Sequence, residues 1–189
     1  MLPKVIGICG LKRCGKDTLA RYFVDHHGYK HCKIADDLKK VVQVLFGFTD
    51  GQLETDEKDQ VDPSWNITPR SAMQFFGTEV MQYKIQEILP DVQRNFWIMS
   101  FIKKHLHTQP IVISDLRFLH EYDALMKASQ SNMLVIRVER DSCVNCSHAS
   151  EQEHKDIPAN MVIHNNGNIE ELYVELKKKL VELDYTLTA

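Results

Sequence analysis

The sequence predicts an α/β domain built on a parallel central sheet of about five strands. Short apolar runs rich in β-branched residues alternate along the chain with segments whose apolar residues recur at helical spacing. The run Ile111-Val112-Ile113 is apolar throughout, as expected of a central strand covered on both faces. Strands that alternate with helices favour a parallel sheet with helices on both of its faces.

In the first half of the chain, each predicted element has a local signal. Apolar residues fill the first strand up to Gly10, and Gly28 is expected to end the first helix. Thr68 and Pro69 have the residue types of a helix N-cap and first turn. The expected elements are a strand over 4–9, a helix over 16–27, a strand over 31–34, a helix over 38–46 and a helix from 69 that ends before Pro90.

The second half of the chain continues the alternation. The sequence Asn165-Asn166-Gly167 predicts a turn between the last strand and the last helix. Residues 49–68, in contrast, are polar and rich in turn formers, and we expect them to form a mobile excursion. The expected elements are a helix over 93–106, a strand over 111–114, a helix over 119–129, strands over 133–138 and 161–163, and a helix over 169–183.

Composition limits the kinds of protein that this chain can be. It has 189 residues, of which 43% are hydrophobic and 26% charged, with a formal net charge of -3. This favours one folded domain and argues against global disorder and against nucleic-acid binding by bulk positive charge. No apolar run approaches the roughly 18 residues of a membrane span, and the start does not resemble a signal peptide. The five cysteines lack the spacing of a disulfide framework, so we expect a reduced, soluble, cytoplasmic protein.

The strongest functional signal is a glycine-containing turn between the first strand and the first helix. Its glycines let successive backbone N–H groups point into one concavity, and the helix N-terminus adds partial positive charge. Lys16 has the place of the lysine that bridges β- and γ-phosphates. The alternative is an ordinary strand-to-helix turn followed by a lysine. The complete motif is Gly10-Leu11-Lys12-Arg13-Cys14-Gly15-Lys16-Asp17-Thr18.

The motif departs from the usual pattern after its lysine. A Ser or Thr usually follows there and contacts Mg²⁺ through its hydroxyl, whereas this chain has Asp17 and then Thr18. A carboxylate beside a triphosphate is unfavourable unless a cation lies between them, so Asp17 is expected to act through magnesium or its waters. Thr18 is then expected to contact the α-phosphate. Cys14 lies near cations and a helix N-terminus, so we expect a lowered pKa for its thiol.

A second signal follows the apolar run at 111–113. Ser114, Asp115 and Arg117 come where that strand ends, and open α/β sheets bind ligands beyond the carboxyl ends of their strands. An acid there can orient magnesium or a substrate hydroxyl, and an arginine can hold a phosphate through two parallel hydrogen bonds. The alternative is an Asp-Arg pair on a surface loop.

Taken together, the motifs resemble those of the viral and bacteriophage deoxynucleoside monophosphate kinases. The match runs in order from about residue 5 to about residue 180, so it covers nearly the whole chain. A weaker similarity links the Gly-Lys-Asp turn and the Ser-Asp-x-Arg sequence to animal-type phosphomevalonate kinases. The matching segments are Lys12 to Thr18, Thr68-Pro69-Arg70, Gln74 to Glu79, Phe96-Trp97, Ser114 to Phe118 with His120-Glu121, His148-Ala149-Ser150-Glu151 and Met161 to Gly167.

The resemblance implies a three-layer α/β/α P-loop kinase fold in a single domain, 1–189. A helical substrate-binding region is expected at about 36–107 and a lid at about 140–158. The implied reaction is the transfer of a phosphoryl group from ATP, with Mg²⁺ as cofactor, to a deoxynucleoside monophosphate. The implied partners are small-molecule nucleotides and, as is common in the family, a second copy of the chain, but neither nucleic acid nor a membrane. A viral protein of this kind would work in the host cytoplasm.

The resemblance also implies roles for individual residues. Lys16, Asp115 and Arg117 would be catalytic, and Asp17 and Asp115 would hold the metal. The ATP-binding residues would be Gly10, Lys12, Arg13, Cys14, Gly15, Lys16, Asp17, Thr18, Arg140, Asn166 and Gly167. The acceptor-binding residues would be Lys39, Arg70, Gln74, Asp115, Arg117, His148, Ser150 and Glu151. Clustered cations need a phosphate-rich ligand to offset their repulsion, and the expected cluster is Lys12, Arg13, Lys16, Lys39, Arg70, Arg117 and Arg140.

Two other functions fit the same residues less well. One is a kinase of another small phosphate, such as phosphomevalonate, and the other is a nucleotide-binding module without catalysis. A module of that kind needs no second anion site, which Lys39, Arg70 and Arg117 would form. A zinc site is a further interpretation of Cys143, Cys146, His148 and His154, but their spacing is not a standard one and plain thiols are favoured.

Overall fold

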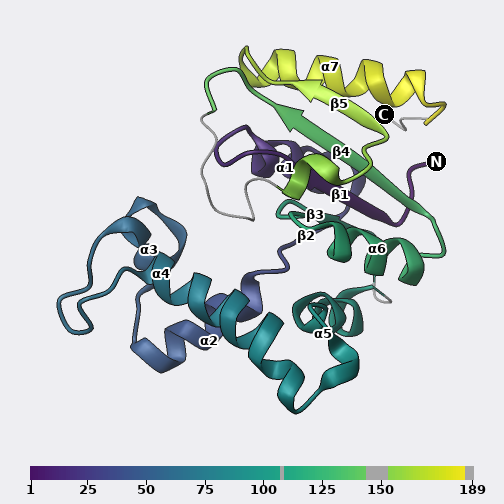
Figure 1. Ribbon diagram of the computed structural model, residues 1–189. Helices are drawn as coiled ribbons and strands as arrows, with labels where there is room; N and C mark the ends of the chain where they lie inside the picture. The colour runs from purple at the N-terminus through teal and green to yellow at the C-terminus, as the bar shows by residue number, and fades with distance from the viewer. Residues whose placement is uncertain (107–108, 144–152, 186–189) are drawn as a thin grey trace. The chain divides into compact units, whose positions relative to one another are not determined.

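The computed structural model describes residues 1–106, 109–143 and 153–185. They form two compact units: a sheet unit, which contains residues 1–33 and the described residues from 101 onward, and a helical unit, Ile34–Ser100. In chain order the elements in Figure 1 are β1 (Val5–Cys9), α1 (Lys16–His27), β2 (Lys30–Cys32), α2 (Asp36–Phe46), α3 (Asp50–Glu54), α4 (Pro69–Gln74), α5 (Phe96–His105), β3 (Ile111–Ile113), α6 (Leu119–Ala128), β4 (Met133–Glu139), β5 (Met161–His164) and α7 (Ile169–Glu182).

The sheet unit is built on one five-stranded sheet with the order β2-β3-β1-β4-β5. Every pairing is parallel, and β1 is central, because Val5 is in register with Ile111 of β3 and with Met133 of β4. The predicted parallel sheet is therefore confirmed. The turn that follows β1 lies at the carboxyl edge of the sheet, where open α/β folds bind ligands.

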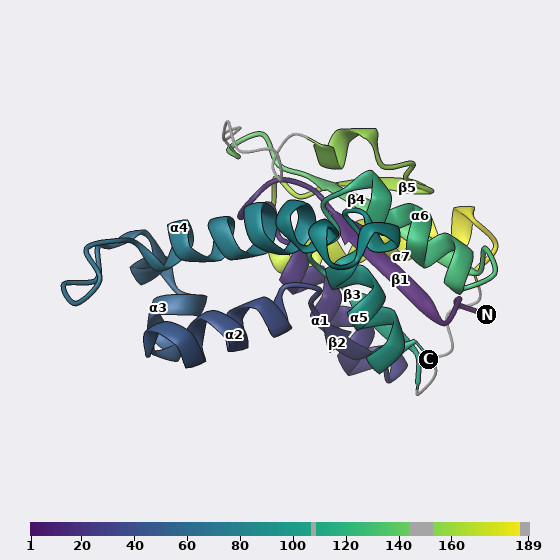
Figure 2. The ribbon, with the colours of Figure 1, turned by 60° about the horizontal axis from the view of Figure 1, so that its bottom comes forward.

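Helices cover both faces of this sheet. Side chains alternate along β1, so Ile6 and Ile8 share one face, where they join Phe23 of α1 and Leu176 of α7 in a single buried core. Leu125 of α6 is also fully buried but does not belong to that core. Figures 1 and 2 show α1 and α7 on one side of the sheet and α6 on the other, which gives three layers.

Residues 49–68, which we expected to form a mobile excursion, contain regular helical turns in their first part. Thr49 accepts a hydrogen bond from the backbone N–H of Gln52, whose side chain accepts one from the backbone N–H of Thr49, and this reciprocal pair starts α3. A 3₁₀ turn, Asp56–Asp59, follows. The Thr-x-x-Gln spacing was the sequence signal for this helix start. Leu53 of α3 is buried in a small core, so the segment is packed rather than extended.

The helix that begins at 69 changes its hydrogen-bond pattern along its length. Thr68 caps α4 by accepting the N–H of Ser71, as predicted, but the continuation Phe75–Tyr83 is π-helical and Lys84–Glu87 is a 3₁₀ turn. A wider π turn leaves backbone carbonyls free for other donors. The indole N–H of Trp97 donates to the carbonyl of Gly77 at 3.0 Å. The predicted single helical pattern was therefore only partly correct.

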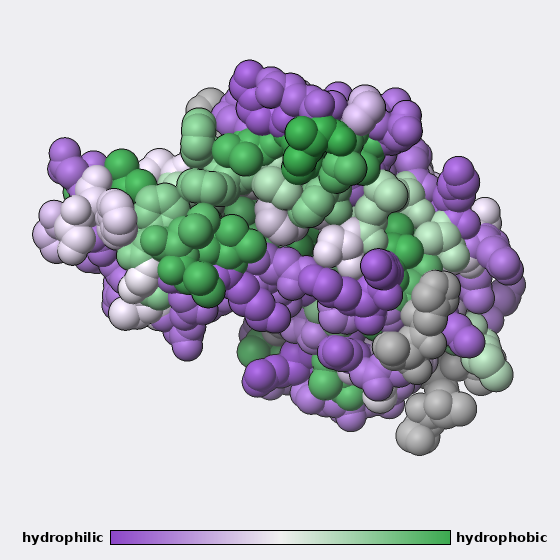
Figure 3. Space-filling view, turned by 90° about the horizontal axis from the view of Figure 1, so that it is seen from below, coloured by the Kyte–Doolittle hydropathy of each residue, from purple (hydrophilic) through white to green (hydrophobic). Residues whose placement is uncertain are grey.

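Apolar side chains also reach the surface of the helical unit. On α2, Val42 is fully buried, whereas Val44 and Leu45 are 83% and 53% exposed. Figure 3 shows apolar patches between hydrophilic regions in the view from below. Only part of the apolar stripe of α2 is therefore buried within this chain. Among the described residues, no helix combines the length and apolar character that crossing a membrane requires.

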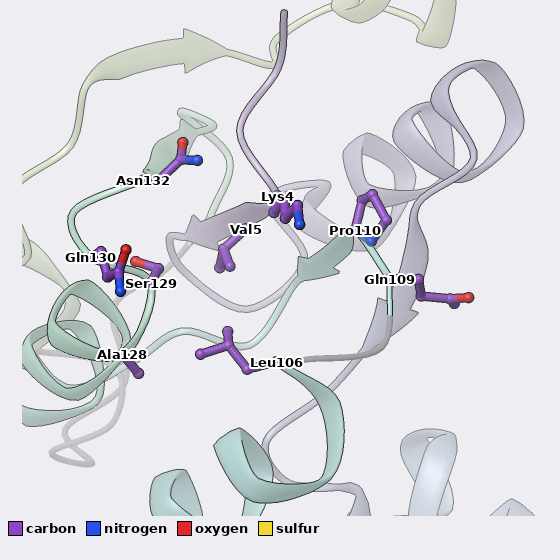
Figure 4. Close-up of a pocket in the computed structure, with 9 residues that line it drawn as sticks. All are labelled: Lys4, Val5, Leu106, Gln109, Pro110, Ala128, Ser129, Gln130 and Asn132. Atoms are coloured by element: carbon purple, nitrogen blue, oxygen red, sulfur yellow. The ribbon is translucent and has the colours of Figure 1, made fainter.

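A cavity of about 520 Å³ opens at the other edge of the sheet (Figure 4). Val5, which lines it, begins β1, and Asn132, which also lines it, directly precedes β4. The cavity is therefore at the amino ends of the strands. Parallel α/β sheets bind substrates at the opposite, carboxyl ends, so we do not place the active site in this cavity.

Candidate active site

The glycine-containing turn joins β1 to α1 at the carboxyl edge of the sheet. Gly15 is the N-cap residue of α1, has a left-handed backbone with φ of 106°, and offers no side chain to cap the helix. The N–H groups of the first turn of α1 therefore have no side-chain cap from this residue. Such N–H groups, together with the helix dipole, form an anion site.

Two glycines are required here for steric reasons. Gly10 has a φ of +140°, and a Cβ atom at this position would lie 2.3 Å from the backbone oxygen of Val138. A Cβ atom on Gly15 would lie 2.3 Å from Nδ2 of Asn165. Only glycine lets the turn approach β4 and the segment after β5 this closely. The glycines thus allow the turn to keep this conformation, in which its successive backbone N–H groups can form a phosphate cradle.

Lys16 is the first residue of α1, and its ammonium group folds back over the turn. Nζ donates hydrogen bonds to the carbonyl oxygens of Gly10 at 2.8 Å and of Leu11 at 2.5 Å. A phosphate oxygen carries charge and would be a stronger acceptor than either carbonyl. The lysine is therefore positioned over the cradle, as the sequence motif predicts.

Asp17 lies in the first turn of α1 and connects three elements. Its Oδ1 accepts a hydrogen bond from Ser114 Oγ at 2.6 Å and lies 3.2 Å from Lys33 Nζ. Ser114 Oγ is also 2.7 Å from His31 Nε2. Burial opposes ionisation, but the Ser114 hydrogen bond and the Lys33 charge outweigh it and lower the pKa of Asp17. The carboxylate is thus kept ionised beside the phosphate cradle.

The two carboxylates predicted to hold magnesium are linked through Ser114. Asp115 directly follows Ser114, whose hydroxyl bonds Asp17, and Asp115 is only 9% exposed. Mg²⁺ uses one or two carboxylates plus water and substrate phosphates, so the side chains of Asp17 and Asp115 are of the chemical type that it prefers. In the described ranges there is no group of three or more His, Cys, Asp or Glu that could hold a metal without such additional ligands.

The turn after β5 is bound to the cradle by a residue that the sequence analysis did not select. Nδ2 of Asn165 donates to the carbonyl of Cys14 at 2.8 Å, and Asn165 is buried. Asn166, which was predicted to contact ATP, exchanges hydrogen bonds with Asp141: each of the two bonds is 2.9 Å long. The Asn-Asn-Gly sequence was the signal for this turn, but it did not show which asparagine faces the cradle.

The expectation that the pKa of the Cys14 thiol is lowered was wrong. Its side chain is fully buried, and burial raises the pKa of the Cys14 thiol despite the nearby ammonium of Lys16. Lys16 Nζ lies 3.8 Å from Sγ and favours the thiolate, but the sulfur lies in the core of the sheet unit, where the loss of hydration outweighs this contact. Cys14 is therefore a packing residue of the turn, and only its backbone can face a ligand.

Comparisons with known proteins identify the family. A family model described as "Deoxynucleotide monophosphate kinase" matches residues 52–176. A protein of Acanthamoeba polyphaga mimivirus named "Putative deoxynucleotide monophosphate kinase" is 31% identical over 184 residues, covering 91% of this chain and 93% of the relative. The chain belongs to the deoxynucleotide monophosphate kinase family. It is therefore a kinase, a phosphotransferase with a nucleotide-binding P-loop.

One solved structure shows the fold that this kinase adopts, and a second is reported for comparison. A gluconokinase from Sinorhizobium meliloti 1021 superposes with a TM-score of 0.51 at 12% identity, covering 96% of this chain and 94% of the other. A shikimate kinase from Aquifex aeolicus vf5 gives a TM-score of 0.46 at 11% identity, with 95% and 96% covered. The kinase has the three-layer α/β/α P-loop kinase fold that was predicted.

The predicted site residues of the kinase are divided between its two units. Lys39 and Arg70 lie in the helical unit, in α2 and at the start of α4, and Gln74 is the last residue of α4. Lys12 and Arg13 are exposed in the P-loop of the sheet unit. The other described site residues of that unit are Gly10, Cys14, Gly15, Lys16, Asp17, Thr18, Asp115, Arg117, Arg140, Asn166 and Gly167. The predicted lid residues His148, Ser150 and Glu151, and Cys146 of the zinc interpretation, lie outside the described residues.

A buried carboxyl group supports Arg117 of the kinase. One oxygen of Glu121 accepts the backbone N–H of Arg117 at 3.0 Å and that of Phe118 at 3.1 Å. Burial raises the pKa of Glu121 to about 8, although these hydrogen bonds act in the opposite direction. The residue fixes the backbone after Asp115 at the start of α6. The sequence analysis gave it no role, although a Glu three residues after an N-cap is a known capping pattern.

This carboxyl group predicts a pH-dependent stability. Glu121 binds its proton more tightly in the folded kinase than in the unfolded chain. Its contribution to the free energy of unfolding is therefore full below its ordinary pKa of 4.5 and is lost as the pH rises through about 8. Glu121→Gln keeps an acceptor oxygen but cannot ionise, so its unfolding free energy should decline less with rising pH. Urea titrations of both proteins at about pH 6 and about pH 8.5 measure the difference. An equal decline in the two proteins would contradict the prediction.

Proposed function

We propose that this kinase transfers the γ-phosphoryl group of ATP to deoxynucleoside monophosphates, giving the diphosphate and ADP. The observation that carries the proposal is the P-loop, in which Lys16 Nζ lies over a cradle that only glycines at positions 10 and 15 permit. Membership of the family supports the nucleotide acceptor. The assay described below determines which of the four bases the kinase accepts.

The donor is proposed to bind in the sheet unit. The backbone N–H groups of the P-loop and the first turn of α1 would bind its phosphates, with Lys16 on the β- and γ-phosphates and Thr18 on the α-phosphate. Lys12 and Arg13 are exposed beside them and would add charge. Arg140, Asn166 and Gly167 would lie near the nucleoside. Mg²⁺, held through Asp17 and Asp115, would supply charge neutralisation at the β- and γ-oxygens.

The acceptor is proposed to bind through cations and an amide of the helical unit. Lys39 and Arg70 would hold its phosphate, and Gln74 would contact its base. Arg117 would meet the transferring group, because a guanidinium can bind two phosphate oxygens at once. The lid residues His148, Ser150 and Glu151 would close over the nucleotides.

The chemical step needs positioning and charge rather than a covalent intermediate. An oxygen of the acceptor phosphate would attack the γ-phosphorus, and the bond to the β-phosphate oxygen would break to release ADP. Lys16 and Arg117 would stabilise the charge that builds on the transferring group. Asp115 would orient the metal-bound waters. Glu121 would keep the backbone of Arg117 in place.

A coupled assay of ADP formation tests the function directly. The purified kinase is given Mg-ATP with dGMP, dTMP, dCMP, dAMP or phosphomevalonate, each at the same concentration. Turnover with one or more of the nucleotides and none with phosphomevalonate is expected. Turnover with phosphomevalonate alone would replace the proposal by its alternative. A thermal-shift screen of the same acceptors, with and without Mg-ATP, reports binding independently of turnover.

Arg70→Ala is expected to raise the KM for the nucleotide acceptor by about tenfold, because it removes a bidentate phosphate donor. The KM for ATP should stay unchanged. Arg94→Ala is the matched control, since Arg94 lies in the same unit but contacts Gln82 and Tyr83. Steady-state kinetics with each substrate varied in turn measures both constants. An unchanged acceptor KM in Arg70→Ala would remove Arg70 from the acceptor site.

A homodimer, which the family resemblance also implies, stays a prediction. Light scattering on the eluting peak of a size-exclusion column measures the mass against the 21.9 kDa of one chain.

A further inference from the structure

The two cations assigned to the acceptor phosphate are both paired with carboxylates in the structure. Lys39 Nζ lies 2.7 Å from each oxygen of Glu54. The guanidinium of Arg70 donates two hydrogen bonds to Asp59, from Nε to one carboxylate oxygen and from a terminal nitrogen to the other. The two carboxylates belong to one short stretch, so a single segment pairs with both cations. We call Glu54 and Asp59 the acidic clasp.

The acidic clasp presents each cation with the geometry of a phosphate. In both pairs two carboxylate oxygens are engaged, and a phosphate monoester offers two oxygens in the same way. The carboxylates occupy hydrogen-bond donors of both cations and offset their positive charge. Bound acceptor and closed clasp therefore compete at Lys39 and Arg70.

The clasp is held in place by the packing of its own segment. Glu54 ends α3 and Asp59 ends the 3₁₀ turn after it, and this stretch packs against α2, which carries Lys39, and α4, which carries Arg70. Leu53, next to Glu54, is buried in the core of the helical unit. The pairs therefore form from an anchored segment rather than from a free loop.

Because the two ion pairs are partly exposed to solvent, another anion can replace the carboxylate in each of them. Side chains are 17% exposed for Lys39 and 53% for Glu54, and 32% for Arg70 and 45% for Asp59. Partly solvated ion pairs of this kind are weak compared with fully buried ones. A phosphate dianion, with twice the charge of a carboxylate, can compete with the carboxylate for either cation.

We propose that the acidic clasp is an internal substitute for the acceptor phosphate, which the incoming nucleotide displaces. This rests on the proposed function, in which Lys39 and Arg70 bind that phosphate. A nucleotide offsets the cost of displacement through its base and sugar contacts, whereas free phosphate has none to offer. Glu54 and Asp59 thus lower the affinity of the acceptor site for nucleotide and free phosphate by the same factor, and the ligand without further contacts, free phosphate, is the one left unbound.

The test is the double variant Glu54→Gln/Asp59→Asn, which keeps side-chain shape but removes both charges. Isothermal titration with the best nucleotide acceptor and with inorganic phosphate should give dissociation constants about threefold to tenfold lower than in the wild type. The acceptor KM should fall by the same factor, with the KM for ATP unchanged. The matched control is Asp50→Asn/Glu87→Gln, since Asp50 contacts Gln43 and Glu87 contacts Lys84. It removes the same charge from the helical unit and should leave both affinities unchanged.

The possible results separate the inference from the proposed function. If Arg70→Ala raises the acceptor KM while the double variant binds acceptor and phosphate no more tightly than the wild type, the clasp is overturned and the function stands. Weaker binding by the double variant would also overturn it, because the carboxylates would then orient the cations. If Arg70→Ala leaves the acceptor KM unchanged, the acceptor assignment itself fails. The single variants Glu54→Gln and Asp59→Asn give the same readings if the double variant folds poorly.

Discussion

Replacement of Lys16 by Ala should lower kcat by at least about a hundredfold, the loss typical of a group that stabilises transition-state charge. Its ammonium lies over the P-loop, held by the carbonyls of Gly10 and Leu11. The γ-phosphate would lose a fixed point charge, while the N–H groups of the loop would still bind ATP. The KM for ATP should therefore change much less than kcat.

The measurement is steady-state turnover with a saturating acceptor, and melting curves show whether the variant is folded. Lys178→Ala is a suitable control because it removes the same side chain from an exposed position on α7. Its kcat should equal that of the wild type. A kcat for Lys16→Ala within about tenfold of the wild type would contradict the role of this lysine.

Replacement of Gly10 by Ala should lower the free energy of unfolding by about 3 kcal/mol or more, a large effect for one methyl group. The new Cβ atom would lie 2.3 Å from the backbone oxygen of Val138 and 2.9 Å from Sγ of Cys14, at a φ of +140°. Neither β4 nor the buried sulfur can move without disturbing the core. Activity should be lost as well, because the P-loop would have to shift.

Gly28→Ala provides the comparison that isolates the steric effect. Gly28 also has a positive φ, +68°, but a Cβ atom there would meet nothing within 4 Å. Its cost should be that of the backbone conformation alone, about 1 kcal/mol. Urea unfolding of the wild type, Gly10→Ala and Gly28→Ala measures how much unfolding free energy each variant loses. If Gly10→Ala lost no more stability than Gly28→Ala, the close approach of the P-loop to β4 would be refuted.

Much of the fold could be predicted because its signals are local. The helix over 16–27 begins and ends where the sequence indicates, and the Thr68 cap is present. Apolar runs marked each strand of the sheet to within about two residues. Two features of secondary structure were missed. The capping pair of Thr49 and Gln52 was not recognised, and the periodicity of apolar residues did not reveal the π-helical segment after Gln74.

For the candidate site, the sequence predicted the residues of the P-loop. It did not predict the hydrogen bonds and ion pairs between residues far apart in the chain. The positions of Gly10, Gly15 and Lys16 follow from a motif of nine consecutive residues, since a phosphate turn needs its glycines and its lysine at fixed spacing. Asn165 was missed because its partner, Cys14, is 151 residues away. His31 and Lys33 were missed for the same reason, because they meet Asp17 only once β2 is placed in the sheet.

The sequence alone determined the family, the order of strands and helices along the chain and the phosphate cradle, because each depends on residues close together in the chain. Only the tertiary structure decided that Cys14 is buried, that Glu121 supports Arg117, and that Lys39 and Arg70 pair with Glu54 and Asp59. These contacts depend on the packing of separate elements against one another. Packing sets burial and the distance between charges, and no local pattern specifies either.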